Sequence, residues 1–254
     1  PRDKAAERVS HDKTWMSRAE SGRLAPSVAE VEILLNFYGL ASDSEECQRL
    51  LQIAREARKR SAQRVPELLR AYYTFEADAV EIRQFGIDLV PGLLQTEEYA
   101  RAVITAMDPT RDPAEIDRLV SFRSQRQVRL TDDDPLRLLV VLDEAALRRV
   151  VGDPEVMRGQ LDRLLKLATL PNVSIQVLPY GAGVHAAMGA PFSVLRLVEP
   201  GGQVVYLENL STTDVLDRAD EVTTYEHAFD RLTHAALDRR SATEMIEKAA
   251  GDLR

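Results

Sequence analysis

The run Leu136-Arg137-Leu138-Leu139-Val140-Val141-Leu142 is almost continuously apolar and has the length of a buried β-strand. Strand-like runs also occupy residues 80–85, 173–178, 192–197 and 204–207. Helical patterns alternate with them, over residues 96–107, 113–130, 153–170, 219–237 and 243–253. This alternation predicts a large mixed α/β domain whose sheet has about five strands and is flanked by helices.

Helix starts in this region carry residues that satisfy free backbone N–H groups. Asp112-Pro113 and Asp153-Pro154 each place a capping side chain before a proline at the first helical position. Thr96 is the expected cap after the rigid turn at Pro91–Thr96. Ser241-Ala242-Thr243-Glu244 has capping-box spacing, which predicts that the last helix begins near residue 243.

The first forty residues instead predict short helices joined by tight turns. The second of these helices runs from about residue 13 to residue 21, and Gly22 ends it. A third begins after Ser27, which with Glu30 forms another capping box. Residues 45–62 follow as a longer helix whose arginines are interpreted as a solvated outer face.

Two of these short helices have the pattern of a helix-turn-helix. Small residues at Ala5 and Ala6 allow the first helix to contact the second closely, while Met16 and Ala19 are expected to bury one face of the second. The opposite face offers groups that reach base edges in a major groove, namely Lys13, Thr14, Trp15 and Arg18.

The segment Thr14–Arg23, with Pro26-Ser27 and Leu34–Leu40, resembles the helix-turn-helix of the xenobiotic-response-element (XRE, Cro/repressor) class. The resemblance implies that residues 13–18 lie in the recognition helix and that Arg2 contacts phosphate. This chain departs from the family at Arg2 (usually Gln), Trp15 (bulkier) and Ala19 (smaller). The expected DNA-binding residues are Arg2, Lys13, Thr14, Trp15, Ser17, Arg18, Ser21 and Arg23.

The remainder resembles the C-terminal domain of unknown function joined to such modules in actinobacterial regulators. The residues that carry this resemblance are Phe75–Ala79, Val90–Ala100, Arg123, Arg126-Gln127, Leu142–Leu147, Gln160-Leu161 and Val173–Pro179. It implies an antitoxin-like transcriptional regulator, often encoded beside a small partner protein. The Trp-Trp pair often found after the connector helix is absent near residues 61–65.

Together these patterns predict three parts. Residues 1–42 form an all-α XRE-type helix-turn-helix module for DNA, residues 43–75 a helical connector, and residues 76–254 an α/β domain for dimerisation, sensing or partner binding. The family has a helix before the pair, which this sequence does not contain, so we expect the first helix of the module to be missing.

Composition narrows the class of protein further. The net charge of −8 argues against a protein that coats nucleic acid nonspecifically. Residues 1–24 nevertheless hold six basic and four acidic side chains, a net charge of +2, so the rest carries −10. A single cysteine excludes an internal disulfide, and no run is long enough to span a membrane. We therefore expect a cytoplasmic protein that reads DNA selectively.

Candidate catalytic and metal-binding groups are sparse. His185 stands alone in a glycine-containing loop, where it is interpreted as a loop residue that could face a pocket. His227 and His234 share a helix face without a third ligand, and Asp143-Glu144 is read as a helix cap. We predict no enzymatic activity, no cofactor and no metal.

The favoured function is a homodimeric transcriptional regulator that binds double-stranded DNA at a pseudo-palindromic operator. Two alternatives concern the larger domain. It could be a ligand-binding or enzyme-like module that responds to an unknown small-molecule effector. It could instead be an interaction module that binds a small protein encoded nearby.

Overall fold

The computed structural model describes residues 2–9, 11, 16, 19, 26–62, 67–199, 201–209 and 212–253. The chain forms two compact units, Pro1–Tyr73 and Thr74–Arg254. The first unit takes in the predicted module at residues 1–42 and most of the predicted connector.

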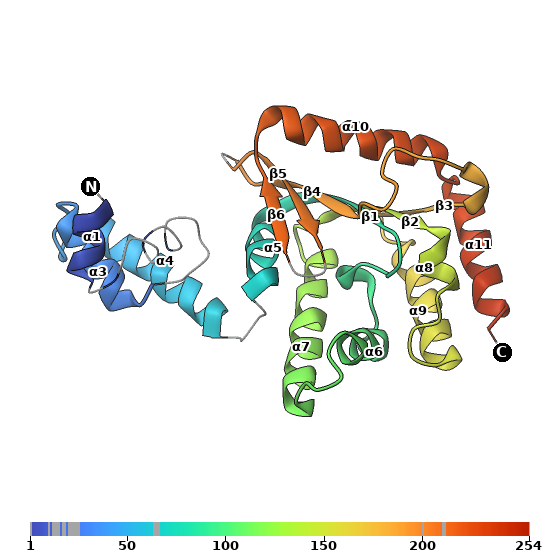
Figure 1. The fold of residues 1–254 in the computed structure, drawn as a ribbon, viewed down its shortest axis with the longest axis horizontal. Coiled ribbons are helices and arrows are strands. Elements are labelled where there is room, and N and C mark those ends of the chain that lie inside the picture. Colours follow the sequence, from blue (N-terminus) through green and yellow to red (C-terminus); the bar gives the residue numbers. More distant parts are fainter. Residues whose placement is uncertain are drawn as a thin grey trace. The chain divides into compact units, whose positions relative to one another are not determined.

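The first unit is helical where it is described (Figure 1). Among the described residues, the helices that lie wholly within it are α1 (Arg2–Arg8), α3 (Val28–Phe37) and α4 (Glu45–Ala62), and α5 (Glu67–Asp78) begins in this unit and ends in the second. Ser27 caps α3 as predicted: its hydroxyl accepts from Glu30 N, and the Glu30 carboxylate accepts from Ser27 N. Gly39, at a φ of +92°, follows the end of α3, a backbone conformation that favours glycine.

The second unit is built on a mixed sheet in the order β3-β2-β1-β4-β5-β6. Strands β1, β2 and β3 are parallel, whereas β4, β5 and β6 are antiparallel to their neighbours. The strands are β1 (Ala79–Gly86), β2 (Arg137–Asp143), β3 (Val173–Leu178), β4 (Phe192–Leu197), β5 (Gln203–Glu208) and β6 (Thr213–Leu216).

Each of the five predicted strands is present. The described residues form a sixth strand as well, which the sequence analysis did not predict. The missed strand, β6, has four residues and pairs only with β5. Its Val215 is 37% exposed. A short edge strand buries little apolar surface, so its sequence carries almost no pattern.

Helices cover both faces of the sheet (Figure 1). α10 (Ala219–Ala235) lies along one face, and α6 to α9 lie on the other, while α11 packs against β3 and α9. The remaining bounds are η1 (Gly92–Leu94), α6 (Glu97–Met107), α7 (Pro113–Arg126), η2 (Gln127–Leu130), α8 (Glu144–Arg148), α9 (Pro154–Leu167), η3 (Tyr180–Ala182) and α11 (Arg239–Gly251).

The predicted caps at Asp112, Asp153 and Thr96 are confirmed. The capping box at Ser241 is wrong, because α11 begins at Arg239 and Asp238 is its N-cap. The Asp238 carboxylate accepts from Ser241 N at 2.8 Å. Aspartate is as good a cap as serine, and the earlier start adds further helical hydrogen bonds.

Both faces of β2 are buried, which explains its nearly continuous apolar sequence. On one face Val141 packs with Phe85 and Phe192 against Phe229 of α10. On the other face the buried residues include Ile82, Leu138, Val140, Leu142 and Leu195.

Within the part of the chain that the structure describes, none of the helices has the length and apolar character needed to cross a membrane.

Candidate functional site

The predicted DNA contacts fall largely outside the described residues. Arg2 begins α1, but its side chain is not described. The others, Lys13, Thr14, Trp15, Ser17, Arg18, Ser21 and Arg23, lie outside the described residues. Between them, Met16 and Ala19 are helical; Met16 is 2% exposed and Ala19 is half-buried, as expected of the packed face.

Met16 belongs to the core of the first unit. Ala5 and Ala6 of α1 pack with Met16, and Leu34 and Phe37 of α3 close the cluster. The prediction that these two alanines form a packing contact with the following helical segment is therefore confirmed. Small side chains allow close approach, so this cluster places Met16 against α1 and α3.

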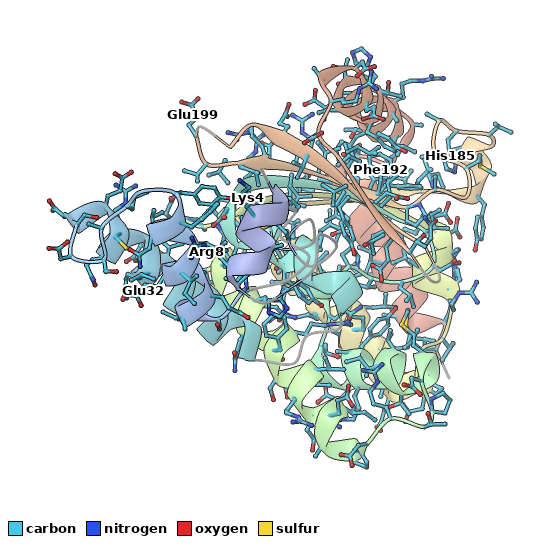
Figure 2. The ribbon with its side chains drawn as sticks, turned by 60° about the vertical axis from the view of Figure 1, so that its left-hand side comes forward. Lys4, Arg8, Glu32, His185, Phe192 and Glu199 are labelled. Atoms are coloured by element: carbon cyan, nitrogen blue, oxygen red, sulfur yellow. The ribbon has the colours of Figure 1, made fainter. Side chains whose placement is uncertain are left out.

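Two cations on α1 are exposed and were not among the predicted contacts (Figure 2). Lys4 and Arg8 lie four residues apart, so they share one side of the helix. The Arg8 guanidinium lies 5.9 Å from the centre of the Phe37 ring, which joins α1 to α3. The spacing of these two cations on one helix face was the signal that sequence reasoning could have used.

Glu30 joins the turn after α1 to the start of α3. Its carboxylate lies 2.8 Å from His11 Nε2 and accepts from Ser27 N. Partial burial opposes ionisation of Glu30, but the hydrogen bonds from Ser27 and His11 outweigh it and lower its pKa.

The second unit contains a buried polar network centred on Gln95, which is 4% exposed. Gln95 Nε2 donates to Val90 O at 2.6 Å, and Gln95 Oε1 accepts from Arg123 of α7. Gln127 Nε2 donates to Gly92 O at 3.2 Å and to Gln95 O at 2.6 Å. Gln127 of η2 and Gln95 itself thus satisfy backbone carbonyl groups of the turn before α6, and Arg123 of α7 holds the Gln95 side chain.

Gln160 of α9 completes this network from a third element. Its Oε1 accepts from Thr96 N at 2.8 Å, and its Nε2 donates to Leu94 O at 2.9 Å. Buried backbone groups must be paired, and a glutamine can both donate and accept. The prediction of a turn at Pro91–Thr96 that leads into a helix capped by Thr96 is confirmed, and hydrogen bonds from α9 and η2 hold this turn.

An ion pair fixes the end of α5 beside the same network. The Glu76 carboxylate is 2% exposed and accepts two hydrogen bonds from the Arg126 guanidinium. Arg129 of η2 donates to Glu76 O and to Ala79 O. We call Glu76, Arg126 and Arg129 the α5 clasp. It satisfies carbonyl groups at the C-terminus of the helix that leads into β1.

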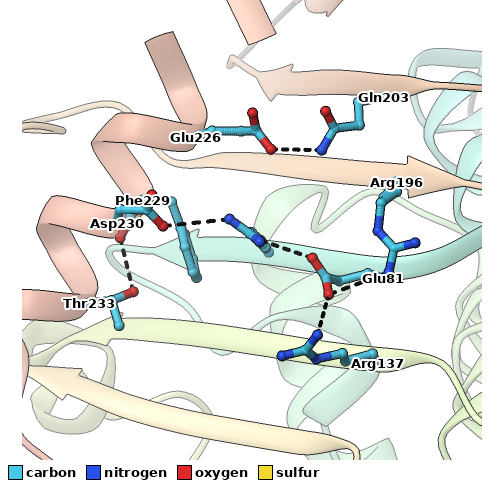
Figure 3. Close-up of polar contacts among 9 residues, drawn as sticks. Glu81, Arg137, Arg196, Gln203, Glu226, Phe229, Asp230 and Thr233 are labelled. Atoms are coloured by element: carbon cyan, nitrogen blue, oxygen red, sulfur yellow. Dashed lines mark hydrogen bonds and ion pairs between the residues drawn. The ribbon is translucent and has the colours of Figure 1, made fainter. Parts of the chain in front are cut away.

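A second polar cluster attaches α10 to its face of the sheet (Figure 3). The buried Glu81 carboxylate lies 3.0 Å from Arg83 Nε, 3.0 Å from Arg137 Nη1 and 3.6 Å from Arg196 Nη2. Arg83 also reaches Asp230 of α10, at 3.5 Å. Three guanidinium groups offset the desolvation cost of the one buried carboxylate, Glu81. We interpret the cluster as structural, because its contact from Arg83 to Asp230 holds α10 against the sheet.

A cleft of about 410 Å³ lies between the C-terminal turn of α10 and the loop after η3. The loop contributes Val184, His185 and Ala186, and the helix contributes Arg231, His234 and Ala235. The His185 ring stacks edge-on against Phe85, near the end of β1. Ligands of open α/β sheets bind outside the carboxyl ends of the parallel strands, which is where this cleft lies. The expectation that His185 could face a pocket is confirmed.

The polar groups of this cleft are two imidazoles and one guanidinium. His234 Nδ1 lies 2.6 Å from Asp230 O, a carbonyl that only accepts, so this nitrogen carries a proton. His185 Nδ1 accepts from Ala187 N at 3.3 Å. None of the described lining residues carries a carboxylate, a hydroxyl or a thiol. Among the described residues there is also no group of three or more His, Cys, Asp or Glu placed to hold a metal ion.

Asp143 and Glu144 follow β2, and both have structural partners. The Asp143 carboxylate accepts from Ala145 N at 2.8 Å and caps α8, as predicted. Glu144 accepts from Tyr180 N at 3.0 Å and pairs with Arg148.

Tyr99 provides a test of the buried region around Gln95 through the pH dependence of stability. Its side chain is fully buried and its hydroxyl accepts from Val90 N at 3.2 Å. Burial raises the pKa of Tyr99 above its usual range, and the Val90 N–H, Arg123 and Arg149 offset only part of this. The neutral hydroxyl therefore stabilises the fold fully below pH about 10, and this stabilisation is lost as the pH rises through the folded pKa.

We expect the free energy of unfolding to fall as the pH rises above about 10. In Tyr99→Phe this component of the fall should disappear, and the unsatisfied Val90 N–H should cost about 1–3 kcal/mol at neutral pH. Urea unfolding at several pH values measures both effects. Tyr180→Phe, at an exposed tyrosine, is the control; an equal change in both variants would contradict the assignment to Tyr99.

Comparison with known proteins identifies the second unit. A family model described as Domain of unknown function (DUF5753) matches residues 69–248. No curated protein and no solved structure matches the chain. The matched residues include the Gln95 network, the α5 clasp and the His185 cleft.

Proposed function

The chain belongs to the DUF5753 family, and on that premise we propose that it is a cytoplasmic, sequence-specific DNA-binding transcriptional regulator. In this proposal the first unit binds double-stranded DNA, and the larger unit forms a homodimer and receives a signal. The proposal includes an antitoxin-like role with a small partner protein, which rests on the resemblance of the sequence alone.

The observation that carries the proposal is the cluster of Ala5, Ala6 and Met16 against α3. A helical position two residues away from a buried one lies roughly 160° around the helix axis. If the helix predicted from the sequence extends over residues 13–21, Thr14 and Arg18 then fall on the side opposite Met16. Two side chains that pair with bases would thus share the outward face of a packed helix.

Two further features support DNA as the partner of the first unit. Lys4 and Arg8 add exposed positive charge on one side of α1, suited to phosphate contacts. The chain outside residues 1–24 carries a net charge of −10, which repels DNA at sites that the protein does not read. One helix-turn-helix offers few base contacts, so a dimer on a two-fold site is expected.

The test is selection of binding sites by the full-length chain from a random duplex library. We expect an enriched pseudo-palindrome that binds about a thousandfold more tightly than random duplex, with affinity that falls steeply as salt rises. Fluorescence anisotropy on the selected and scrambled duplexes measures the difference. Equal affinity for both duplexes, or no enrichment, would overturn the proposal.

A second candidate function concerns the larger unit alone. The His185 cleft combines Arg231 and two imidazoles at the carboxyl end of the parallel strands, which favours a ligand-binding module. Mass spectrometry of the chain purified from its native host separates the candidates. A retained metabolite favours ligand sensing, whereas a tightly bound small protein favours partner binding.

A further inference from the structure

We propose that a second cleft, between α7–η2 and α9, binds a small amphipathic anion: one carboxylate or phosphate head carrying a short hydrocarbon tail. The cleft has a volume of about 380 Å³, within the range of small-molecule sites. It lies apart in sequence from the His185 cleft and shares no lining residue with it. The inference does not depend on DNA binding by the first unit.

The positive charge of the cleft is available to a ligand. Arg163 and Lys166 both line it, and because they lie three residues apart on α9 they share one helix face. Lys166 forms no ion pair with any described residue, and Arg163 donates to the neutral Gln127 Oε1 at 3.2 Å. None of the described lining residues carries a carboxylate. The three aspartates at residues 132–134 follow the lining residue Thr131 in sequence but are not themselves lining residues.

The remainder of the lining is suited to a hydrocarbon tail. Leu130 and Leu167 are buried and Leu170 is half-buried, and these side chains form the apolar part of the wall. Val128, at the end of the same cleft, is 55% exposed, so an apolar group that covered it would remove its surface from water. Ser124 also lines the cleft and carries a hydroxyl that can donate to an anionic head, whereas the hydroxyl of the lining residue Thr131 donates to Val128 O at 3.2 Å.

Gln127 connects the cleft to the interior of the unit. Its Oε1 accepts from Arg163 at the cleft, while its Nε2 holds Gly92 O and Gln95 O. η2, which begins at Gln127, also carries Arg129 of the α5 clasp. An anion held by Arg163 and Lys166 would therefore restrain η2 and the turn at residues 90–96. Amide hydrogen exchange in these segments should slow when the ligand binds.

The test uses the full-length chain and isothermal titration with four probes: octanoate, octyl phosphate, octanol and inorganic phosphate. We expect at least one of the two amphipathic anions to bind at least about tenfold more tightly than octanol or inorganic phosphate. Preference for octanoate assigns a carboxylate head, and preference for octyl phosphate assigns a phosphate head. Equal binding of octanol, equal binding of inorganic phosphate, or no binding of either amphipathic anion overturns the proposal.

Variants locate the site. Lys166→Gln and Arg163→Gln should each weaken binding of the preferred anion by about tenfold and abolish the slowed exchange at residues 127–130. Lys248→Gln on α11 removes the same charge elsewhere and should leave binding unchanged. Arg231→Gln tests the His185 cleft; loss of binding in that variant, with no loss in Lys166→Gln, overturns the assignment. Because Lys166 is exposed and unpaired among the described residues, its variant should fold normally.

Discussion

Replacing Arg126 with alanine is expected to lower the free energy of unfolding of the larger unit by about 3–5 kcal/mol. The substitution leaves the Glu76 carboxylate buried without its guanidinium partner. The Glu76 side chain is 2% exposed, so its carboxylate keeps most of its desolvation penalty once the guanidinium is removed. Urea unfolding followed by far-UV circular dichroism is the measurement, because the single tryptophan, Trp15, lies in the first unit.

Arg118, which is exposed on the same helix, provides the matched control. Arg118→Ala should change the free energy of unfolding by no more than about 0.5 kcal/mol. Replacing both members of the pair, as Glu76→Leu with Arg126→Met, should recover most of the loss, since no isolated charge is then buried. An Arg126→Ala effect as small as that of Arg118→Ala would show that the α5 clasp contributes little to stability.

Arg18→Ala is expected to weaken binding to the selected DNA site by about 1–3 kcal/mol, or about five- to 150-fold. The proposed reason is a bidentate contact from the guanidinium to a guanine in the major groove. The same substitution should relax the base preference at one position of each half-site while the rest of the site is still read. Anisotropy titrations against single-base variants of the site measure both effects.

A phosphate contact would behave differently from a base contact at Arg18. Loss of a phosphate contact weakens binding to all sequences about equally. It also reduces the slope of log affinity against log salt concentration by about one. Arg118→Ala, a loss of the same side chain in the larger unit, should leave DNA binding unchanged. Unaltered affinity and base preference in Arg18→Ala would remove the recognition-helix assignment from the proposal.

Local patterns were sufficient for most of the secondary structure. The apolar run at residues 136–142 predicted β2 almost to the residue, because a strand covered on both faces must be apolar along its length. Asp112, Asp153 and Thr96 marked helix starts correctly, because a cap acts on N–H groups two or three residues away. Asp238 was overlooked for the same local reason: Ser241 nearby offered a competing start.

The candidate sites depended on contacts that no local pattern contains. Gln95 bonds Arg123 across 28 residues, and Gln160 bonds Leu94 across 66. The resemblance singled out these side chains without indicating that they meet. The sequence analysis assigned no role to Arg163 or Lys166, because only the position of η2 beside α9 makes them the cationic side of a cleft.

By itself the sequence determined the α/β class, five of the strands, most helix starts and the helical character of the first unit. These features follow from hydrophobic periodicity and capping, which act over a few residues. Only the tertiary structure decided the strand order, the Gln95 network, the α5 clasp and the two clefts. Each of these requires side chains from different elements to meet, and burial then selects partners by the need to pair every polar group removed from water.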